Sequence, residues 1–460
     1  MPLRSKEGMH EDVSTVVIGI TILVLALAGT WIARPVEESG SRERYAKGWP
    51  SPLTATVGLP GGWADSPIEA FRNKSGGWNL LPVALGMGWV ALIGGLGTVL
   101  GGRSLRAYLP GALVLVLLTV LAYLLAGQKV VKYYNLEYPL WALAVGLLVT
   151  NVAATPRWLT PALLGEFFIK TGLVVFGGEV LVSRLLALGL PGLMTSWIVT
   201  PIVLTATYLF GVHVLRIESK PLCMTLSADM SVCGVSAAIA TGAACRAKKE
   251  ELSLAIGLSL FFTMIMMIAM PPVIRWMELD PILGGAWIGG TIDATGAVVA
   301  AGESLGKEAG EVAATVKMIQ NSMIGLIAFA VAVYWAGWVD HDGSGPRVTL
   351  AGEAWRRFPT FILGFLAMSL VCSWLHAQGP EQSLWVEGAT DGFTKHLRGW
   401  LFCTGFVCMG LQTNLRELAP MLLSGRAVVL YVAGQALNLV LTLAMASLTF
   451  GWLFRKVVEP

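Results

Sequence analysis

The sequence predicts an all-α polytopic membrane protein of about 13 transmembrane segments, from its composition and the recurrence of long apolar runs. Of the 460 residues, 55% are hydrophobic and only 13% are charged, and the mean hydropathy is +0.68. A soluble domain carries roughly 25% charged residues. Most of this chain is therefore expected to lie in the hydrocarbon core of a membrane, where charged side chains are costly. We expect a multi-pass protein of the bacterial inner membrane.

The first apolar run, Val13–Ala33, has the length needed to cross the hydrocarbon core. The residues before it include Glu7, Glu11 and Asp12, which is unlike the basic start of a signal peptide. We therefore interpret it as a retained first span. The other expected spans lie near 79–99, 110–127, 138–154, 162–187, 191–212, 222–245, 252–274, 281–303, 312–338, 357–376, 396–419 and 427–453.

Between the first two spans, segment 34–78 is the longest polar stretch, and it contains Trp49, Trp63 and Trp78. Tryptophan favours the headgroup zone, so we expect an interfacial segment here. A stripe of glycines on the second span, including Gly97 and Gly101, predicts close helix packing.

Charge and metal-ligand spacing exclude several classes of protein. The net charge of +3 comes with no long basic run, so no nucleic-acid partner is expected. The six cysteines form no C-x-x-C pair and are interpreted as buried apolar side chains. The five histidines form no metal-binding pattern. We expect no metal, no cofactor and no enzymatic activity, because no nucleophile–base arrangement is visible either.

Two pairs of similar segments within the chain suggest internal repeats. Thr171–Gly177 aligns with Thr404–Gly410, and Val232–Gly242 aligns more weakly with Ile292–Gly302. Paired hydrophobic segments interrupted by glycine are the best sequence indicator of a transporter binding site. The members of the second pair lie so close in the chain that one of them is re-entrant or the second repeat is permuted; the sequence leaves both readings open.

Segments 227–236 and 289–296 are polar, contain glycine and lead into helices of small residues. A helix that starts at mid-membrane exposes unpaired N–H groups and the positive end of its dipole. These groups cost several kcal/mol in hydrocarbon unless something satisfies them, and a bound anion does so. We therefore expect a small anion to bind between the two helix starts.

Asp293 is an ionisable residue deep in a span, which costs at least about 2.5–3.5 kcal/mol and suggests a function. We expect it to be the site of the coupling ion, H⁺ or Na⁺, with Asp229 as a second candidate. The alternative is that Asp293 caps a helix or pairs structurally with a lysine.

Lys317, Gln320 and Asn321 share one face of the following span. Lys317 would contact the anion or neutralise Asp293, or alternatively reach the interface. Gln412 and Asn414 directly follow Thr404–Gly410, the second segment of the first repeat, and are expected to line the anion-binding site. The candidate substrate-binding residues are Ser231, Cys233, Gly234, Ser236, Thr291, Thr295, Gly296, Lys317, Asn321, Gln412 and Asn414.

These motifs together resemble the sulfate exporter family, which is similar to the bile-acid/sodium symporter-like transporters. The residues that carry the resemblance are Thr171–Gly177, Ser231–Ala238, Asp293–Gly302 with Lys317, and Gly410–Asn414.

The resemblance covers residues 138–453 and implies a core of inverted repeats with two broken helices crossing at the membrane centre. It leaves residues 1–137, three spans plus segment 34–78, as an added N-terminal transmembrane unit. Many members carry His-Glu where this chain has Ile292-Asp293, and an Arg where it has Gln320 or Asn321, so neither the substrate nor the coupling ion is carried over from the family.

We expect a secondary transporter that exports or exchanges a small anion such as sulfate, sulfite or an organosulfonate. The alternative is a sodium/proton antiporter or a sodium-coupled carboxylate symporter of the same architecture, with Asp229 and Asp293 as a working pair. The expected partners are the anion and the lipid bilayer, and a homodimer is left open.

Overall fold

The chain is almost entirely helical in the part that the structure covers. The computed structural model describes residues 11–34, 48–72, 77–133, 138–335, 339, 360–416 and 425–455. Parts of the expected interfacial segment, 35–47 and 73–76, lie outside these residues. Among the described residues, eight helices are long and apolar enough to cross a membrane, and three shorter apolar helices accompany them. Most expected spans coincide with a helix or with two helices separated by a short break, but the boundary expected between spans 162–187 and 191–212 lies inside α8 (Val182–Leu209). Residues 336–338, 357–359 and 417–419 of three further expected spans lie outside the described residues. The prediction of an all-α polytopic membrane protein is confirmed.

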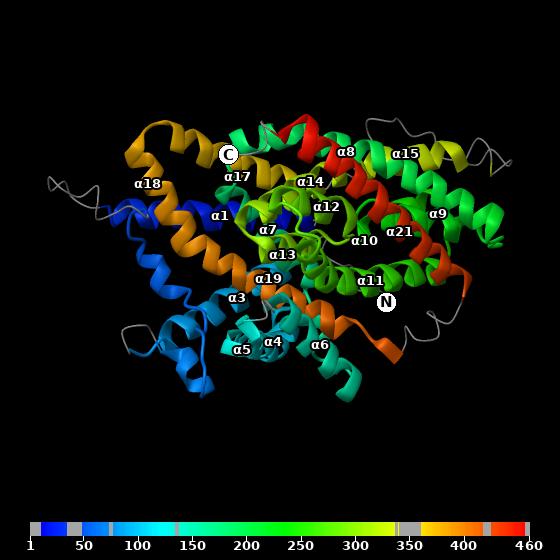
Figure 1. The fold of residues 1–460 in the computed structure, drawn as a ribbon. Coiled ribbons are helices and arrows are strands. Elements are labelled where there is room, and N and C mark those ends of the chain that lie inside the picture. Colours follow the sequence, from blue (N-terminus) through cyan, green and yellow to red (C-terminus); the bar gives the residue numbers. More distant parts are fainter. Residues whose placement is uncertain are drawn as a thin grey trace. The chain divides into compact units, whose positions relative to one another are not determined.

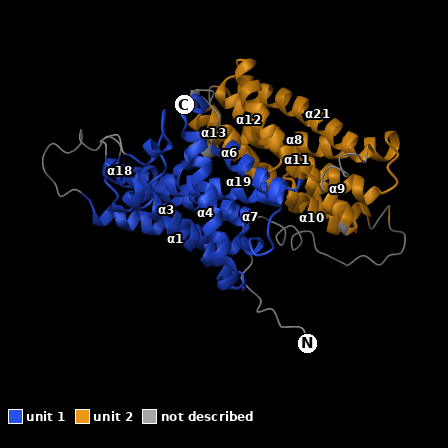
Figure 2. Cartoon of the chain, turned by 90° about the horizontal axis from the view of Figure 1, so that it is seen from below, with its two compact units in different colours: residues 1–183, 360–414 blue, residues 184–359, 415–460 orange. Residues whose placement is uncertain are grey.

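The helices form two compact units, which Figure 2 distinguishes by colour. Unit 1 contains residues 1–183 and 360–414, and unit 2 contains residues 184–359 and 415–460. The boundary expected after residue 137 does not coincide with either unit, since residues 138–183 group with the N-terminal spans. A separate added N-terminal unit stays a prediction.

Unit 1 is built around α7 and α19, which pack directly against each other. These helices carry the two similar segments, Thr171–Gly177 and Thr404–Gly410, of the first internal repeat. A Cβ placed on Gly172 would lie 2.6 Å from the ring of Phe402, and one on Gly405 would lie 2.5 Å from Ile169. Glycine is thus required at both crossings. The helices of unit 1 are α1 (Glu11–Ile32), α3 (Leu80–Leu100), α4 (Leu105–Gly127), α5 (Lys129–Tyr133), α6 (Tyr138–Ala153), α7 (Gly165–Phe176), α17 (Phe361–Ala377), α18 (Pro380–Ala389) and α19 (Lys395–Gln412).

A buried ion pair joins the end of α7 to α19. The guanidinium of Arg398 donates to both carboxylate oxygens of Glu179, each at 3.0 Å, and both side chains are about 5% exposed. Arg398 also lies over the rings of Phe176 and Phe402. The pair ties the same two helices that the glycine contacts bring together.

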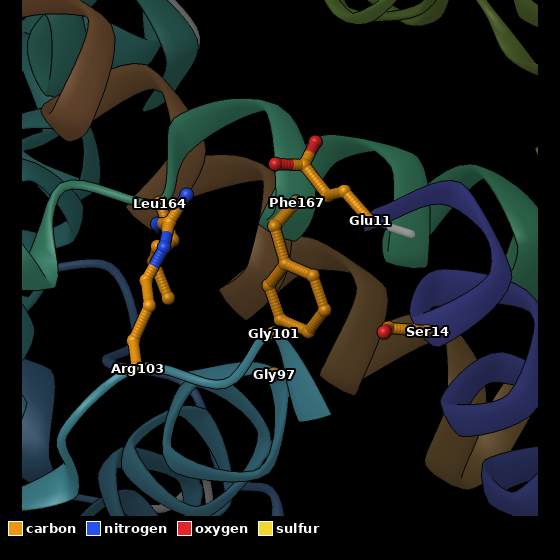
Figure 3. Close-up of a pocket in the computed structure, with 7 residues that line it drawn as sticks. All are labelled: Glu11, Ser14, Gly97, Gly101, Arg103, Leu164 and Phe167. Atoms are coloured by element: carbon orange, nitrogen blue, oxygen red, sulfur yellow. The ribbon is translucent and has the colours of Figure 1, made fainter. Parts of the chain in front are cut away.

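The glycine stripe on α3 packs closely, as predicted, and its partners are aromatic rings. A Cβ on Gly86 would lie 2.6 Å from Trp400, and one on Gly97 would clash with the ring of Phe167. Figure 3 shows this ring beside Gly97 and Gly101, at the edge of a pocket that is also lined by Glu11, Ser14, Arg103 and Leu164.

Unit 2 contains both predicted broken helices (Figure 1). The first is interrupted at residues 232–234, where Gly234 adopts φ +65° and ψ −124°. Residues other than glycine rarely adopt this backbone conformation. The second is interrupted at 292–294, where Ile292 and Ala294 are extended. The helices of unit 2 are α8 (Val182–Leu209), α9 (Lys220–Ser231), α10 (Val235–Ala244), α11 (Lys249–Trp276), α12 (Pro281–Thr291), α13 (Thr295–Leu305), α14 (Lys307–Asn321), α15 (Ile324–Tyr334) and α21 (Arg426–Ala446).

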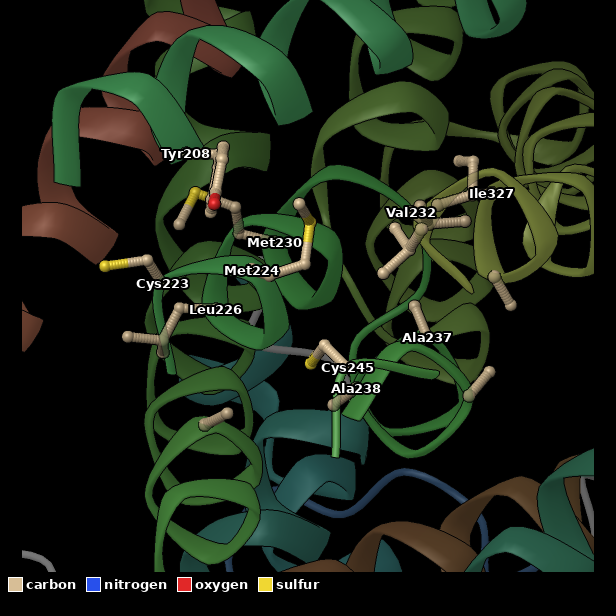
Figure 4. Packing of buried hydrophobic residues seen from close by; sticks show 14 of the residues in the cluster. Tyr208, Cys223, Met224, Leu226, Met230, Val232, Ala237, Ala238, Cys245 and Ile327 are labelled. Atoms are coloured by element: carbon tan, nitrogen blue, oxygen red, sulfur yellow. The ribbon is translucent and has the colours of Figure 1, made fainter. Parts of the chain in front are cut away.

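An apolar cluster surrounds the first break and holds it in place. Met224 and Met230 of α9, Val232 in the break and Ala237 of α10 are buried together with Ile327 of α15 (Figure 4). All six cysteines are buried and free, as predicted. Apolar side chains of α9, α10 and α15 therefore pack against the first break.

Candidate functional site

The two breaks of unit 2 meet in a buried polar centre. A Cβ placed on Gly234 would lie 2.7 Å from Ser259 Oγ, 3.3 Å from Asp293 Cβ and 3.9 Å from Asp229 Oδ1. Asp229 and Asp293 are at most 1% exposed. Side chains from α9, α11 and the α12–α13 break thus converge on one glycine.

The interrupted helices α9 and α12 end in carbonyl groups, and side chains from α14 cap them. Gln320 Nε2 donates to Ser231 O (3.0 Å) and lies 3.2 Å from Gly290 O, so a single amide serves both helices. Lys317 Nζ donates to Val232 O at 2.5 Å. Buried carbonyls without donors are costly in a membrane, so these contacts make the breaks tolerable.

Helix α21 supplies further caps from its own polar face. Asn438 Nδ2 donates to Met230 O (3.3 Å), and Gln435 Nε2 donates to Thr291 O (3.3 Å). Gln435 and Asn438 thus form hydrogen bonds between helices.

The other halves of the broken helices, α10 and α13, begin at this centre. Their first intrahelical bonds run from Ala238 N to Gly234 O and from Val298 N to Ala294 O. The N–H groups of residues 235–237 and 295–297 therefore have no acceptor within their own helix. Beside the start of α13, Asn321 Nδ2 donates to Thr295 Oγ1 at 3.0 Å, and Asn321 Oδ1 is buried without a hydrogen-bond partner.

The two carboxyl groups have different surroundings. Asp293 accepts hydrogen bonds from Tyr431 Oη, from Ser259 Oγ (3.4 Å) and from Gln435 Nε2 (3.4 Å). Neither oxygen of Asp229 has a donor in hydrogen-bonding geometry. Asp293 directly precedes Ala294, the N-cap residue of α13, and the alternative that it caps a helix stays a prediction.

Lys317 lies where it acts electrostatically on both carboxyl groups. It is 1% exposed and also donates to Gln320 Oε1 at 2.8 Å. The alternative that it reaches the membrane interface is wrong, because its ammonium group is buried among the breaks.

The predicted site residues of unit 2 come together here, with one exception, and the role of Gln412 and Asn414 of unit 1 in lining the site stays a prediction. Ser236 belongs to the first turn of α10 but its side chain is exposed. Gln412 and Asn414 belong to unit 1, where Gln412 Nε2 donates to Leu163 O at 3.0 Å. The residues grouped around the two breaks are Asp229, Ser231, Cys233, Gly234, Thr291, Asp293, Thr295, Gly296, Lys317 and Asn321.

Sequence reasoning missed Ser259 and Tyr431, both of which donate to Asp293. Tyr431 shares its helix face with Gln435 and Asn438 at i, i+4 and i+7, which is a signal that could have found it. Ser259 is a single hydroxyl in an apolar span, and nothing local distinguishes it.

The comparison with known families matches residues 110–425 to the family described as "Conserved hypothetical protein 698". A UPF0324 membrane protein of Rhodopirellula baltica is 55% identical over 89% of this chain and 74% of its own length. The chain belongs to the UPF0324 family of membrane proteins.

Two further members of the UPF0324 family show its range. One from Nitratidesulfovibrio vulgaris is 50% identical over 77% of this chain, and the match spans 62% of that relative's length. The UPF0324 membrane protein TauZ of Paracoccus pantotrophus is 28% identical over 64% of this chain and 83% of its own length. This chain therefore spans less than two thirds of some relatives. No solved structure matches it.

Proposed function

We propose that this UPF0324 protein is a secondary transporter that exports or exchanges a small anion such as sulfate, sulfite or an organosulfonate. The observation that carries the proposal is that α10 and α13 both begin at one polar centre, beside the buried Asp229 and Asp293. Their unpaired N–H groups and positive dipole ends favour an anion. The resemblance to sulfate exporters points the same way.

The anion would bind at the start of α13, where Thr295, Gly296 and Asn321 meet. This place offers hydrogen-bond donors: the backbone N–H groups at the start of α13, the hydroxyl of Thr295 and the Nδ2 amide group of Asn321, which lies 3.0 Å from that hydroxyl. Lys317 contributes positive charge from the neighbouring turn of α14. One of the two carboxyl groups, Asp293 or Asp229, would bind the coupling ion, H⁺ or Na⁺, beside the anion.

Sulfate flux into proteoliposomes tests the proposal. Thr295→Val keeps the shape of the side chain but removes its hydroxyl. Losing a hydrogen bond to a charged ligand costs about 1.5–3 kcal/mol, so we expect the sulfate affinity to fall roughly tenfold or more.

The matched control is Thr241→Val in α10, whose hydroxyl bonds only within its own helix, to Ala237 O. It should transport sulfate as the wild type does. Flux of sulfate and other oxyanions that is absent from the wild type, or unchanged by Thr295→Val, would contradict the proposed site.

A second candidate function rests on the buried pair Asp229 and Asp293. Two carboxyl groups beside one lysine also suit a sodium/proton antiporter, which binds either cation at one site. Sodium-driven proton flux that needs no anion would favour this function over anion transport.

A further inference from the structure

We infer that Asp229 carries the coupling proton, that Asp293 stays a fixed carboxylate, and that the proton and the anion bind in the same state. This inference rests on the proposed function for its anion, and it names the coupling ion and the sign of the coupling. It also reverses the expectation from the sequence, in which Asp293 was the first candidate for binding the coupling ion and Asp229 the second.

The first step compares the donors around the two groups. Asp293 accepts from a tyrosine, a serine and an amide, which together compensate a negative charge. Asp229 is fully buried, and neither of its oxygens has a donor in hydrogen-bonding geometry; the hydroxyl of Ser259 faces Asp229 but donates to Asp293. A buried charge without donors is far more costly than a buried neutral acid, so the geometry places the proton on Asp229.

The second step considers the groups that face Asp229 from the elements packed around α9. Asp293 and Lys317 face it with opposite charges, Tyr431 faces it from α21, Ser259 from α11 and Cys233 from its own break. Tyrosine, serine and thiol are neutral in their ordinary forms. When Asp229 is neutral, Asp293 and Lys317 cancel; when it is ionised, the centre carries one negative charge.

The third step concerns the anion. The starts of α10 and α13 attract an anion into a neutral centre, whereas a negative centre opposes it. Protonation of Asp229 therefore strengthens anion binding, and by linkage the anion strengthens proton binding equally. The two move in the same direction. An inward proton gradient would thus drive uptake, and export would run on the anion's own gradient and carry protons out.

Proton uptake on sulfate binding tests the coupling in the purified wild-type protein, with a pH indicator in weak buffer. We expect protons to be taken up with sulfate. In the alkaline range the sulfate affinity should fall about tenfold per pH unit, as one linked proton requires. Sulfate binding without proton uptake across the whole acid-to-alkaline series, or with a requirement for sodium instead, would overturn the inference.

Asp229→Asn imitates the protonated acid. This variant should bind sulfate with an affinity that no longer depends on pH and should exchange sulfate for sulfate, but should not couple sulfate to proton flux. The control is Asp391→Asn, an exposed carboxylate in unit 1 that forms an ion pair with Lys395; it should behave as the wild type. Retained proton uptake in Asp229→Asn would overturn the inference.

Infrared spectroscopy gives a readout that does not need the anion. The carbonyl band of a protonated carboxyl group should be present in the wild type, absent in Asp229→Asn and retained in Asp293→Asn. Loss of this band in Asp293→Asn alone would overturn the assignment. If the wild type binds no oxyanion while the band follows Asp229, the proposed function and the joint binding fail, and the proton on Asp229 stands.

Discussion

Replacing Gly234 by alanine tests the geometry of the first break most directly. The backbone of Gly234 has φ +65° and ψ −124°, a conformation that residues with a Cβ atom rarely adopt. Holding an alanine in this conformation should cost about 1–3 kcal/mol of stability. The new Cβ would also lie 2.7 Å from Ser259 Oγ. Moving that side chain off its rotamer costs roughly 0.5–1.5 kcal/mol more.

The matched control is Gly242→Ala in the same helix. Its Cβ would meet Leu252, its nearest neighbour, at 3.5 Å, an ordinary contact, and its backbone is helical. Alanine should stabilise that position by about 0.5–1 kcal/mol. We therefore expect the two variants to differ by about 2–5 kcal/mol in the free energy of unfolding.

Denaturant-induced unfolding of the purified protein in detergent measures this difference. Adding Ser259→Ala to Gly234→Ala removes the clash but not the backbone strain, so it should restore only part of the stability. If Gly234→Ala were as stable as Gly242→Ala, the break would not need a glycine and the described geometry would be wrong.

Two further predictions concern buried polar contacts. Gln320→Leu removes the amide that serves the ends of both α9 and α12, and each uncapped carbonyl should cost roughly 1–3 kcal/mol; unfolding measurements that show no loss would refute its capping role. Arg398→Met removes the ion-pair partner of the buried Glu179 carboxylate and should cost about 3–5 kcal/mol. Adding Glu179→Leu should recover much of this loss in the same assay, and a double variant less stable than Arg398→Met would contradict the pairing.

The breaks themselves could be predicted from the sequence, because their causes are local. Gly234 allows an unusual backbone conformation, and Asp293 with its flanking threonines interrupts an apolar span. The spacing of Lys317 and Asn321 placed them on one face of a helix. These features need no knowledge of distant residues.

The partners of the two acids could not be predicted in the same way. Tyr431 is 138 residues from Asp293 along the chain, and no local pattern specifies such a contact. Gln412 and Asn414 were placed at the site by analogy with a repeat. A repeat predicts similar helices, but it does not specify which unit those helices join.

The capping amide of Gln320 has a mechanical consequence. Since one side chain links the ends of α9 and α12, neither helix can slide past the other without breaking a buried hydrogen bond. Lys317 and Asn321 lie one helical turn apart on α14, and they engage the first and the second break, respectively. The C-terminal part of α14 thus links the two helix breaks to each other. Any conformational change of unit 2 would therefore move both breaks together as one rigid unit.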